Sequence, residues 1–338
     1  MIIPPKYILT PKISEYLSRI ESAKEVINSI SIPPEIEINI RRRSTLRSSL
    51  FSARIEGNTL TLDDIARLPS KDQRQIEISN ILKALNLISE RPARDLTLKD
   101  LTQFHSIVMH GLIEKQNLGN FRTESSAIFN AAGIAIYMPP PPRQISSLVN
   151  KLVAYINSPK ENFNPIRACL AHYVFEKIHP FLDGNGRVGR ILLQAVLAKG
   201  GYGMKGLLAV EEKLDKQRAS YYKDLESPER DVTDYLEFML ECIAISAHEA
   251  KDQVLEKQKV EAEDYLLPRR AEILRVIKDH GMVSFDQIRR RFLAINERTL
   301  RYDLKKLQDG GLIRKRGATN GAFYEPIKNS TTSPSFIT

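Results

Sequence analysis

Residues 179–190 read HPFLDGNGRVGR, and this stretch decides how the chain around it folds. Apolar residues recur at helical spacing from Asn164-Pro165 up to the stretch, and the same spacing continues beyond it as far as Gly200-Gly201. Proline is favoured in the first turn of a helix, and glycine just past the last turn. We therefore predict that the stretch forms the loop between two packed helices and the first turn of the second helix.

The residue types in this loop suit a polyphosphate and a metal ion. Free N–H groups at a helix N-terminus form an anion site, and Gly184 and Gly186 let the backbone approach phosphate oxygens closely. The side-chain amide of Asn185 can donate to the same anion. Asp183 offers a carboxylate for Mg²⁺, which keeps most of its waters and bridges phosphates. His179 is the one group in the stretch that can take a proton near neutral pH.

Two arginines complete the stretch. Arg187 and Arg190 lie three residues apart, so we expect them to share one face of the first helical turn and to hold two phosphate groups. The alternative is a polar helix-capping loop without a function. Two arginines and a histidine, with no acidic excess beside them in the sequence, would be costly to bury for packing alone.

The stretch also matches the Fic family signature H-P-F-x-[D/E]-G-N-G-R-x-x-R at every fixed position, and the chain resembles Fic-domain proteins over roughly residues 30–250. The resemblance implies a mainly α-helical Fic core with a small β-hairpin flap. It also implies transfer of AMP from ATP to a hydroxyl group of a target protein. Residues 171–178 resemble the lead-in helix of the family. Residues 119–142 resemble its flap, which is thought to hold the target as an added strand.

The resemblance implies a role for each residue of the loop. His179 would deprotonate the target hydroxyl, and Asp183 would hold Mg²⁺ against the α- and β-phosphates. Arg190 would orient the γ-phosphate, and a pair of tyrosines would flank the adenine. The implied nucleotide-binding residues are Gly184, Asn185, Gly186, Arg187, Gly189, Arg190, Tyr221 and Tyr222. Some relatives carry an Asn shortly after the tyrosines, whereas residues 226–229 of this chain read ESPE.

Residues 52–57 read SARIEG and match the inhibitory motif of the family, [S/T]-x-x-x-E-[G/N]. We expect a helix over about residues 44–57, because its apolar residues recur on one face. If this helix packs on the active site, Glu56 can pair with Arg190, and an arginine so engaged cannot place the γ-phosphate. The alternative is an ordinary amphipathic helix that ends at Gly57.

Charge is unevenly distributed along the 338 residues. Residues 267–328 hold 15 Lys and Arg against 7 Asp and Glu, a net charge of +8, whereas the other 276 residues hold 35 against 34, a net charge of +1. Such an asymmetry suggests a nucleic-acid surface. The hydrophobic content of 42% is enough to bury the cores of two domains.

The remaining composition bears on the cellular compartment. Cys169 and Cys242 lack metal-ligand spacing and suit a reducing compartment. No apolar run approaches the ~18–20 residues of a membrane span, and residues 1–6 lack the layout of a signal peptide. We therefore expect a cytoplasmic protein without a membrane partner.

We predict four parts of the chain. They are an N-terminal helical region over residues 1–95 that includes the inhibitory helix, a Fic catalytic domain over 96–255, a winged helix-turn-helix over 267–328, and a disordered tail over 329–338.

The winged helix-turn-helix is predicted from three short helices and a hairpin wing. Ser284 and Gln287 form a capping box for its second helix, and Asn296 caps its third helix. In such modules the third helix enters the major groove of DNA. The side chains expected to face DNA are Arg298, Arg301, Tyr302 and Lys305. The alternative is a solvated basic module used for protein contacts or dimerisation.

Three functions remain open from the sequence. The first is a protein adenylyltransferase held inactive by its own N-terminal helix, with target proteins bound along residues 119–142. The second is a DNA-binding regulator that uses the Fic fold as a nucleotide sensor. The third is a Fic enzyme that removes AMP or transfers another phosphate-containing group. The sequence does not decide between a monomer and a homodimer.

Overall fold

The computed structural model describes residues 1–65, 72–90, 94–129, 135–256, 266–293, 295–317 and 322–327. The chain divides into two compact units. The larger unit contains residues 1–31 and 40–254, and the smaller contains residues 32–39 and 255–338. The predicted tail, and residues 318–321 of the predicted wing, lie outside the described residues.

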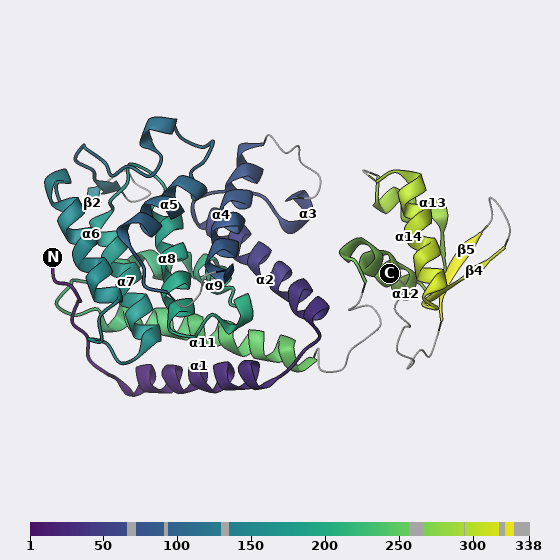
Figure 1. Cartoon of the computed structure of the whole chain (residues 1–338), viewed down its shortest axis with the longest axis horizontal. Helices are drawn as coiled ribbons and strands as arrows, with labels where there is room; N and C mark the ends of the chain where they lie inside the picture. The colour runs from purple at the N-terminus through teal and green to yellow at the C-terminus, as the bar shows by residue number, and fades with distance from the viewer. Residues whose placement is uncertain are drawn as a thin grey trace. The chain divides into compact units, whose positions relative to one another are not determined.

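The first 256 residues form mainly helices (Figure 1). In chain order the elements are α1 (Pro11–Ser29), α2 (Pro34–Ile55), α3 (Leu62–Ile65), α4 (Gln73–Glu90), α5 (Leu98–Val108), the 3-10 turn η1 (Lys115–Asn117), β1 (Ile128–Phe129), β2 (Ala135–Tyr137), α6 (Pro142–Ile156), α7 (Asn164–Ile178), α8 (Asn185–Lys199), the 3-10 turn η2 (Met204–Gly206), α9 (Val210–Lys216), α10 (Arg218–Leu225) and α11 (Thr233–Glu256). The prediction of a mainly α-helical fold is confirmed.

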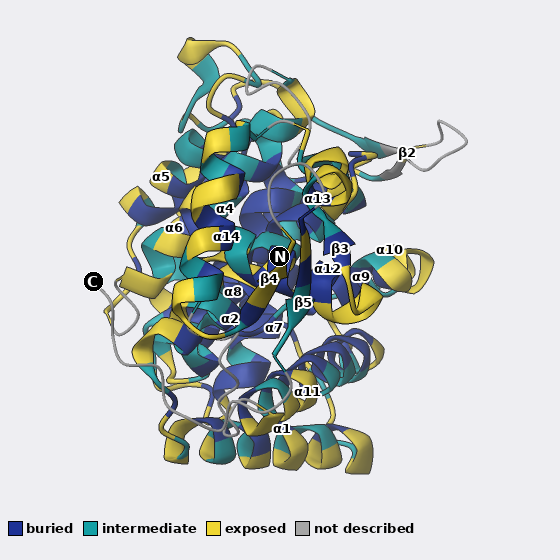
Figure 2. Cartoon of the chain, turned by 90° about the vertical axis from the view of Figure 1, so that its right-hand side faces the viewer, coloured by how far each residue is buried: buried dark blue, intermediate teal, exposed yellow. Residues whose placement is uncertain are grey.

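Helices α7 and α8 lie at the centre of the larger unit. Nearly every residue of both is buried (Figure 2). Helix α7 packs against α6 and α8, while α4 and α5 pack against α8. A helix that is buried on all sides is typical of the middle of a large core. The loop between α7 and α8 is therefore held at both ends by the most densely covered part of the fold.

Two helix boundaries differ from those predicted. Helix α2 begins at Pro34 rather than near residue 44, because proline suits the first turn of a helix and the acidic Glu35 and Glu37 are favourable at its positive end. Sequence pattern also predicts a helix over residues 98–113, but α5 ends at Val108 and the chain turns at Gly111, whose φ is 77°. In both cases the helix exists and one of its ends was placed wrongly.

The hairpin of β1 and β2 is short. Its strands pair antiparallel, with a register shift between Ile128 and Phe129. The residues between the strands, 130–134, lie outside the described part of the chain. The hairpin leads directly into α6 through a run of prolines, and it belongs to the predicted flap over residues 119–142.

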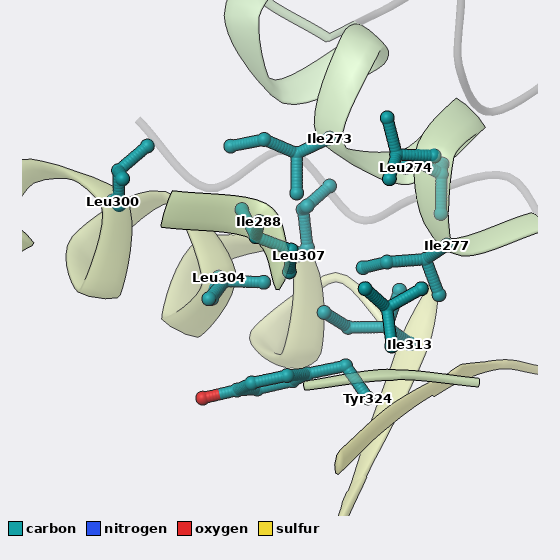
Figure 3. Packing of buried hydrophobic residues seen from close by; sticks show 11 residues of the cluster. Ile273, Leu274, Ile277, Ile288, Leu300, Leu304, Leu307, Ile313 and Tyr324 are labelled. Carbon is teal, nitrogen blue, oxygen red and sulfur yellow. The ribbon is translucent and has the colours of Figure 1, made fainter. Parts of the chain in front are cut away.

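The smaller unit combines three helices with a three-stranded antiparallel sheet. Its elements are α12 (Pro268–His280), β3 (Val283–Ser284), α13 (Phe285–Arg291), α14 (Glu297–Asp309), β4 (Ile313–Arg316) and β5 (Phe323–Pro326). Strand β5 pairs with both β3 and β4. The predicted capping box of Ser284 and Gln287 is present, and Asn296 caps α14. The core includes Ile273, Leu274, Ile277, Ile288, Leu300, Leu304, Leu307, Ile313 and Tyr324 (Figure 3).

Among the described residues, no helix combines the length and the apolarity that a membrane span requires.

Candidate active site

The loop between α7 and α8 begins and ends in left-handed backbone. His179 caps the C-terminus of α7 with φ 49° and ψ 61°, and Gly184 precedes α8 with φ 81° and ψ 6°. A Cβ atom on Gly184 would lie 2.5 Å from the sulfur of Met109, so glycine is required there for space as well as for backbone angle. As predicted, the stretch joins two packed helices and opens the second.

The side chain of Asn185 closes this loop. Its Oδ1 accepts from the backbone N–H of Phe181 at 2.9 Å, and its Nδ2 donates to the carbonyl oxygen of Phe181 at 2.8 Å. Nδ2 of Asn185 carries a second N–H, so the expectation that this amide donates to an anion stays a prediction. Asn185 also holds the turn in front of the first N–H groups of α8, which can meet a ligand.

His179 is partly buried at the head of the loop. Its Nδ1 atom is buried and makes no hydrogen bond with any described residue. Burial lowers the pKa of its imidazole, which favours the neutral form. Its carbonyl oxygen accepts from Nε of Arg122 at 2.8 Å, and another nitrogen of the same guanidinium donates to the carbonyl of Pro140 at 2.6 Å. Arg122 thus ties both ends of the predicted flap region to the backbone of His179.

His105 supports the loop from α5. It stacks on Phe181 with ring centroids 3.9 Å apart. Its Nδ1 accepts from the N–H of Gly119 at 2.8 Å, so its Nε2 carries the proton and donates to the carbonyl oxygen of Asp183 at 3.1 Å. Burial lowers the pKa of His105 to about 4, so the ring is neutral and structural.

Asp183 and Arg187 form the outer side of the site. The Asp183 side chain is 59% exposed, and its Oδ1 accepts from Nη2 of Arg187 at 3.0 Å. The other end of the Arg187 guanidinium donates from Nη1 to Oε1 of Glu77 on α4, at 2.6 Å. Among the described residues, no group of three or more metal-ligating side chains exists, so Asp183 contributes a single carboxylate.

Arg190 forms the inner side of the site, and its side chain is only 1% exposed. Its Nε donates to Oγ of Ser52 at 3.0 Å, and its Nη2 donates to Oε1 of Glu56 at 2.9 Å. Burial lowers the pKa of this guanidinium, but the Glu56 carboxylate outweighs burial and holds the pKa above its ordinary value. The structure therefore brings together the arginine and the glutamate of the two sequence motifs.

Glu56 lies directly over the start of α8. A Cβ atom on Gly186 would lie 2.4 Å from Oε1 of Glu56, so only glycine lets the carboxylate come this close to the helix. Burial raises the pKa of Glu56, but Arg190 and Arg187 together outweigh burial and the pKa is lowered. A carboxylate thus occupies the position at which the helix N-terminus would attract a phosphate.

A second carboxyl lies beside the same arginine. Glu176 on α7 has a buried Oε1 atom without a hydrogen-bond partner among the described residues. This oxygen lies so close to Gly189 that a Cβ atom there would overlap it. Burial raises the pKa of Glu176 to about 8, while Arg190 acts in the opposite direction. Because Glu56 already pairs with that guanidinium, Glu176 remains protonated at neutral pH.

The two tyrosines of α10 have different environments. Tyr221 is 1% exposed, and its hydroxyl bonds to Nε2 of His172 at 3.0 Å. Tyr222 is 41% exposed, and its hydroxyl donates to the carbonyl of Ile55 at 3.4 Å. The expectation that both rings flank a base is not met for Tyr221, which is a core residue in this conformation. Only Tyr222 of the pair presents its ring to solvent.

The predicted DNA-facing residues lie in the smaller unit. Arg298, Arg301, Tyr302 and Lys305 are all exposed on α14, on the side of the helix opposite Leu300, Leu304 and Leu307. Arg301 also lies over the ring of Phe285, with 3.9 Å between its guanidinium carbon and the ring centroid.

The site also contains residues that sequence reasoning missed. Glu77 belongs to no recognisable local pattern, yet it accepts from Arg187. Arg122 and Glu176 lie in the segments that resemble the flap and the lead-in helix, but sequence reasoning assigned neither of them a role. Arg122 bonds to His179, and Glu176 lies against Gly189. Glu77 and Arg187 are separated by 110 positions in the sequence, so only the packing of α4 on α8 brings them together.

Comparison with known proteins agrees with this geometry. Residues 95–197 match the Fic/DOC family. The chain is 27% identical over 239 residues to the protein adenylyltransferase Fic of Drosophila mojavensis, an alignment that covers 67% of this chain and 45% of that protein. For the protein of the same name in Drosophila grimshawi the identity is 28% over 240 residues, with coverages of 66% and 47%. The chain thus spans less than half the length of these curated relatives.

Solved structures extend the likeness in fold. A Fic family protein from Desulfovibrio desulfuricans G20 covers 97% of this chain and 99% of its own length, with a TM-score of 0.66 and 24% identity. Fic-1 from C. elegans covers 73% of both chains, with a TM-score of 0.57 and 19% identity. At these identities the comparison supports the fold, and the chemistry has to be argued from the site.

Proposed function

We propose that this protein transfers AMP from ATP to a hydroxyl side chain of a target protein. One observation carries the proposal: a histidine whose neutral form is favoured by burial, a glycine-lined helix N-terminus and a buried arginine meet where α7 is joined to α8. The relatives named protein adenylyltransferase Fic support it. The alternative, a DNA-binding regulator that only senses a nucleotide, would not require a histidine base beside a phosphate site.

In this proposal each residue has one task. Nδ1 of His179 is buried, so Nε2 is the nitrogen that takes the proton from the target hydroxyl. The hydroxyl oxygen then attacks the α-phosphorus, the bond to the β-phosphate oxygen breaks, and pyrophosphate leaves. The N–H groups of Asn185 and Gly186 at the start of α8 hold the phosphates, while the N–H of Gly184 donates to Oδ1 of Asp183. Tyr222 lies beside the base. The target binds along residues 119–142, whose ends Arg122 ties to His179.

Mg²⁺ fits the donor set of this site. A single, largely exposed carboxylate suits an ion that prefers waters and phosphate oxygens to an all-protein cage. Asp183 would hold it, and the ion would neutralise charge that develops on the phosphates. Arg187 would have to release Oδ1 of Asp183 or share it.

Autoinhibition is part of the proposal. Glu56 occupies the guanidinium of Arg190 and places negative charge over the start of α8. ATP then meets a carboxylate where its γ-phosphate belongs, so the nucleotide binds in an unreactive pose. The bonds of Arg190 to Ser52 and Glu56 supply this arrangement from within the chain.

Labelling with ATP that carries ³²P on the α-phosphate tests the proposal. In a Glu56→Gly background, His179→Ala should reduce labelling of protein by about 10²–10⁴-fold, the usual contribution of a positioned base. His248→Ala, which removes an exposed histidine of α11, is the matched control and should not change the rate. Equal labelling with and without His179 would refute the assignment. Release of label from pre-modified protein would instead favour removal of AMP.

We also propose that the smaller unit is a winged helix-turn-helix that contacts duplex DNA. The order of its helices and strands supports the fold, and the exposed basic face of α14 supports the contact. Titration of duplex DNA with the full chain at rising salt tests this contact.

A further inference from the structure

Glu77 on α4 connects two parts of the site that the proposed reaction uses separately. Its side chain is 13% exposed, and each carboxylate oxygen accepts from a different segment of the chain. Oε1 accepts from Nη1 of Arg187 at 2.6 Å, and Oε2 accepts from Nδ2 of Asn58 at 2.8 Å. Arg187 lies in the first turn of α8, and Asn58 follows Glu56 by two residues. One carboxylate therefore contacts both the phosphate loop and the segment that carries the inhibitory glutamate.

Asn58 is fixed through every part of its amide. It follows Gly57, which turns the chain after α2 with φ 100°. Its Nδ2 donates to the carbonyl of Arg74 at 3.0 Å as well as to Glu77, and its Oδ1 accepts from the N–H of Leu60 at 3.1 Å. The side chain thus ties residues 56–58, which we call the inhibitory turn, to the first turn of α4.

Arg187 is held between two carboxylates of different kinds. Its Nη2 donates to Oδ1 of Asp183, whose side chain is 59% exposed. Asp183 is also the residue proposed to hold Mg²⁺, so its oxygen has a second claimant. Glu77 is less exposed, and both of its oxygens already have partners. Glu77 is therefore the partner that remains for Arg187 when Asp183 serves the ion.

The bond to Glu77 does not exhaust the arginine. A guanidinium has five N–H donors, and the bonds to Glu77 and Asp183 use two of them. The Nε atom of Arg187 is buried and has no hydrogen-bond partner in the described part of the chain. Arg187 also helps to lower the pKa of Glu56, so its charge acts on the space that Glu56 covers. Donors and charge thus remain for phosphate oxygens.

The alternative is that Glu77 competes with phosphates for Arg187. The geometry disfavours it, because the Arg187 side chain is only 9% exposed and needs a partner wherever it lies. Without Glu77, its fork would turn toward Asp183, the other carboxylate that it contacts. That movement would occupy the oxygen proposed for Mg²⁺ and would withdraw Arg187 from its present position.

We propose that Glu77 is a positioning residue that holds Arg187 for the phosphates of ATP, and that the same carboxylate anchors the inhibitory turn through Asn58. The two halves can be separated, because Asn58 takes part only in the anchor, whereas Glu77 takes part in both. Its effect on transfer rests on the proposed function, whereas its effect on ATP affinity is measurable without any transfer.

Calorimetry with ATP and Mg²⁺ tests the positioning half. The full chain with Glu56→Gly and His179→Ala is the parent, since it lacks the inhibitory carboxylate and the proposed base. Adding Glu77→Ala should weaken ATP binding by at least about tenfold, the usual effect of losing a hydrogen bond to a charged group. Removing a negative charge would by itself strengthen the binding of a polyanion. A fall in affinity therefore reports the position of Arg187 and not the net charge.

Asn58→Ala is the matched control in the same parent. It loses the same bond to Glu77 but leaves Arg187 engaged, so ATP affinity should not change. Glu90→Ala, which removes an exposed glutamate at the other end of α4, should also bind as the parent does. Equal losses in Asn58→Ala and Glu77→Ala would mean that α4 acts through general packing, and would overturn the positioning role.

Kinetics give a second readout. With His179 intact and Glu56→Gly present, Glu77→Ala should raise KM for ATP by a factor similar to the loss of affinity. A smaller folded fraction alone would lower the apparent kcat and leave KM unchanged. For the anchor, Asn58→Ala should raise labelling by the otherwise wild-type chain about 2–10-fold, the range for one hydrogen bond. It should have no effect once Glu56 is removed, because no inhibitory contact is left to anchor.

Unchanged or tighter ATP binding in Glu77→Ala would overturn the positioning role and favour competition for Arg187. Unchanged labelling by Asn58→Ala would overturn the anchor. If Glu77→Ala does not fold, Glu77→Gln decides the same questions, because it keeps the side-chain volume but has only one oxygen for two donors. Weaker ATP binding without Glu77, together with no transfer by any variant, would uphold the positioning role and refute the proposed function alone.

Discussion

The two units of this protein use arginine in opposite ways. In the larger unit, the side chains of Arg190 and Arg187 are 1% and 9% exposed, and each is engaged by a carboxylate from a distant part of the chain. In the smaller unit, Arg289 and Arg301 are 55% and 60% exposed, and both pair with Glu297 at the surface. A buried guanidinium must have its partners in place, because desolvation is expensive. An exposed pair contributes little and is screened by salt.

This difference predicts which changes are costly. Buried charge in the larger unit is fixed in one arrangement, so changing it should alter stability and the proposed activity sharply. Charge on α14 is available to a partner, so changing it should leave the fold intact and alter only binding. The four predictions below test this contrast in order of expected size.

The largest effect is expected for stability. Arg190→Ala leaves Glu56 without its cation and empties a buried position, so we expect a loss of about 3–5 kcal/mol in the free energy of unfolding. Arg298→Ala on α14 should change it by less than about 0.5 kcal/mol. Urea unfolding, with peptide-resolved hydrogen exchange to separate the two units, measures both.

Arg190→Lys is the informative control. A lysine ammonium cannot reproduce the fork that bonds Ser52 and Glu56 together, so it should recover only part of the loss. Adding Glu56→Gln to Arg190→Ala removes the orphaned carboxylate and should restore some stability. A small loss for Arg190→Ala, similar to that for Arg298→Ala, would contradict the contrast.

The second prediction concerns pH. Burial raises the pKa of Glu176 to about 8 from an ordinary value of 4.5. Between these values the folded state holds a proton that the unfolded state has released, so stability falls as pH rises from 4.5 to 8. The slope is at most about 1.4 kcal/mol per pH unit. Glu176→Gln cannot titrate, so its advantage over the wild type should grow through this window.

Unfolding by urea at pH 5, 6, 7 and 8 measures this advantage. Glu15→Gln changes an exposed glutamate of α1, 64% exposed in its side chain, and should show a constant difference from the wild type. A constant difference for Glu176→Gln as well would mean that Glu176 is ionised in the folded state.

The third prediction concerns activity. Glu56→Gly frees Arg190 and removes a negative charge over α8, so AMP transfer should rise by about 10–100-fold, the range expected for losing a charge-assisted hydrogen bond. The rise should require Arg190, so Arg190→Ala with Glu56→Gly should gain little. Labelling at saturating ATP measures the rates.

Asp215→Asn is the matched control for this gain. Asp215 also contacts α2, through Arg54 at 3.4 Å, but it does not reach Arg190. It should label at the wild-type rate. Equal rates for the wild type and Glu56→Gly, with both proteins folded, would show that residues 44–57 form only a structural helix.

The sequence predicted the parts of the site that depend on local pattern. The loop over residues 179–190, its flanking helices and the capping box at Ser284 follow from spacing and end-signals within a few residues. Paired prolines such as those at 33–34 usually break a helix, yet the second of them starts α2. Local pattern did not reveal the bonds of Asn185 within its own turn or the contact of Glu77 with Arg187. Both depend on how helices pack after they form.

The smallest effect is expected for α14. If its basic face contacts phosphates, binding of the full chain to a 20-base-pair duplex should weaken steeply as salt rises, through release of counterions. Arg298→Ala and Lys305→Ala should each weaken binding similarly on unrelated sequences and reduce the slope of log affinity against log salt by about 1. Fluorescence anisotropy from low to physiological salt measures this slope, and Lys151→Gln in the larger unit should not change it. The unfolding curve of Arg298→Ala should match that of the wild type, in contrast to Arg190→Ala. If the full chain does not bind DNA at low salt, the exposed arginines serve contacts with protein, and the contrast between fixed and available charge would then have to be tested with that partner.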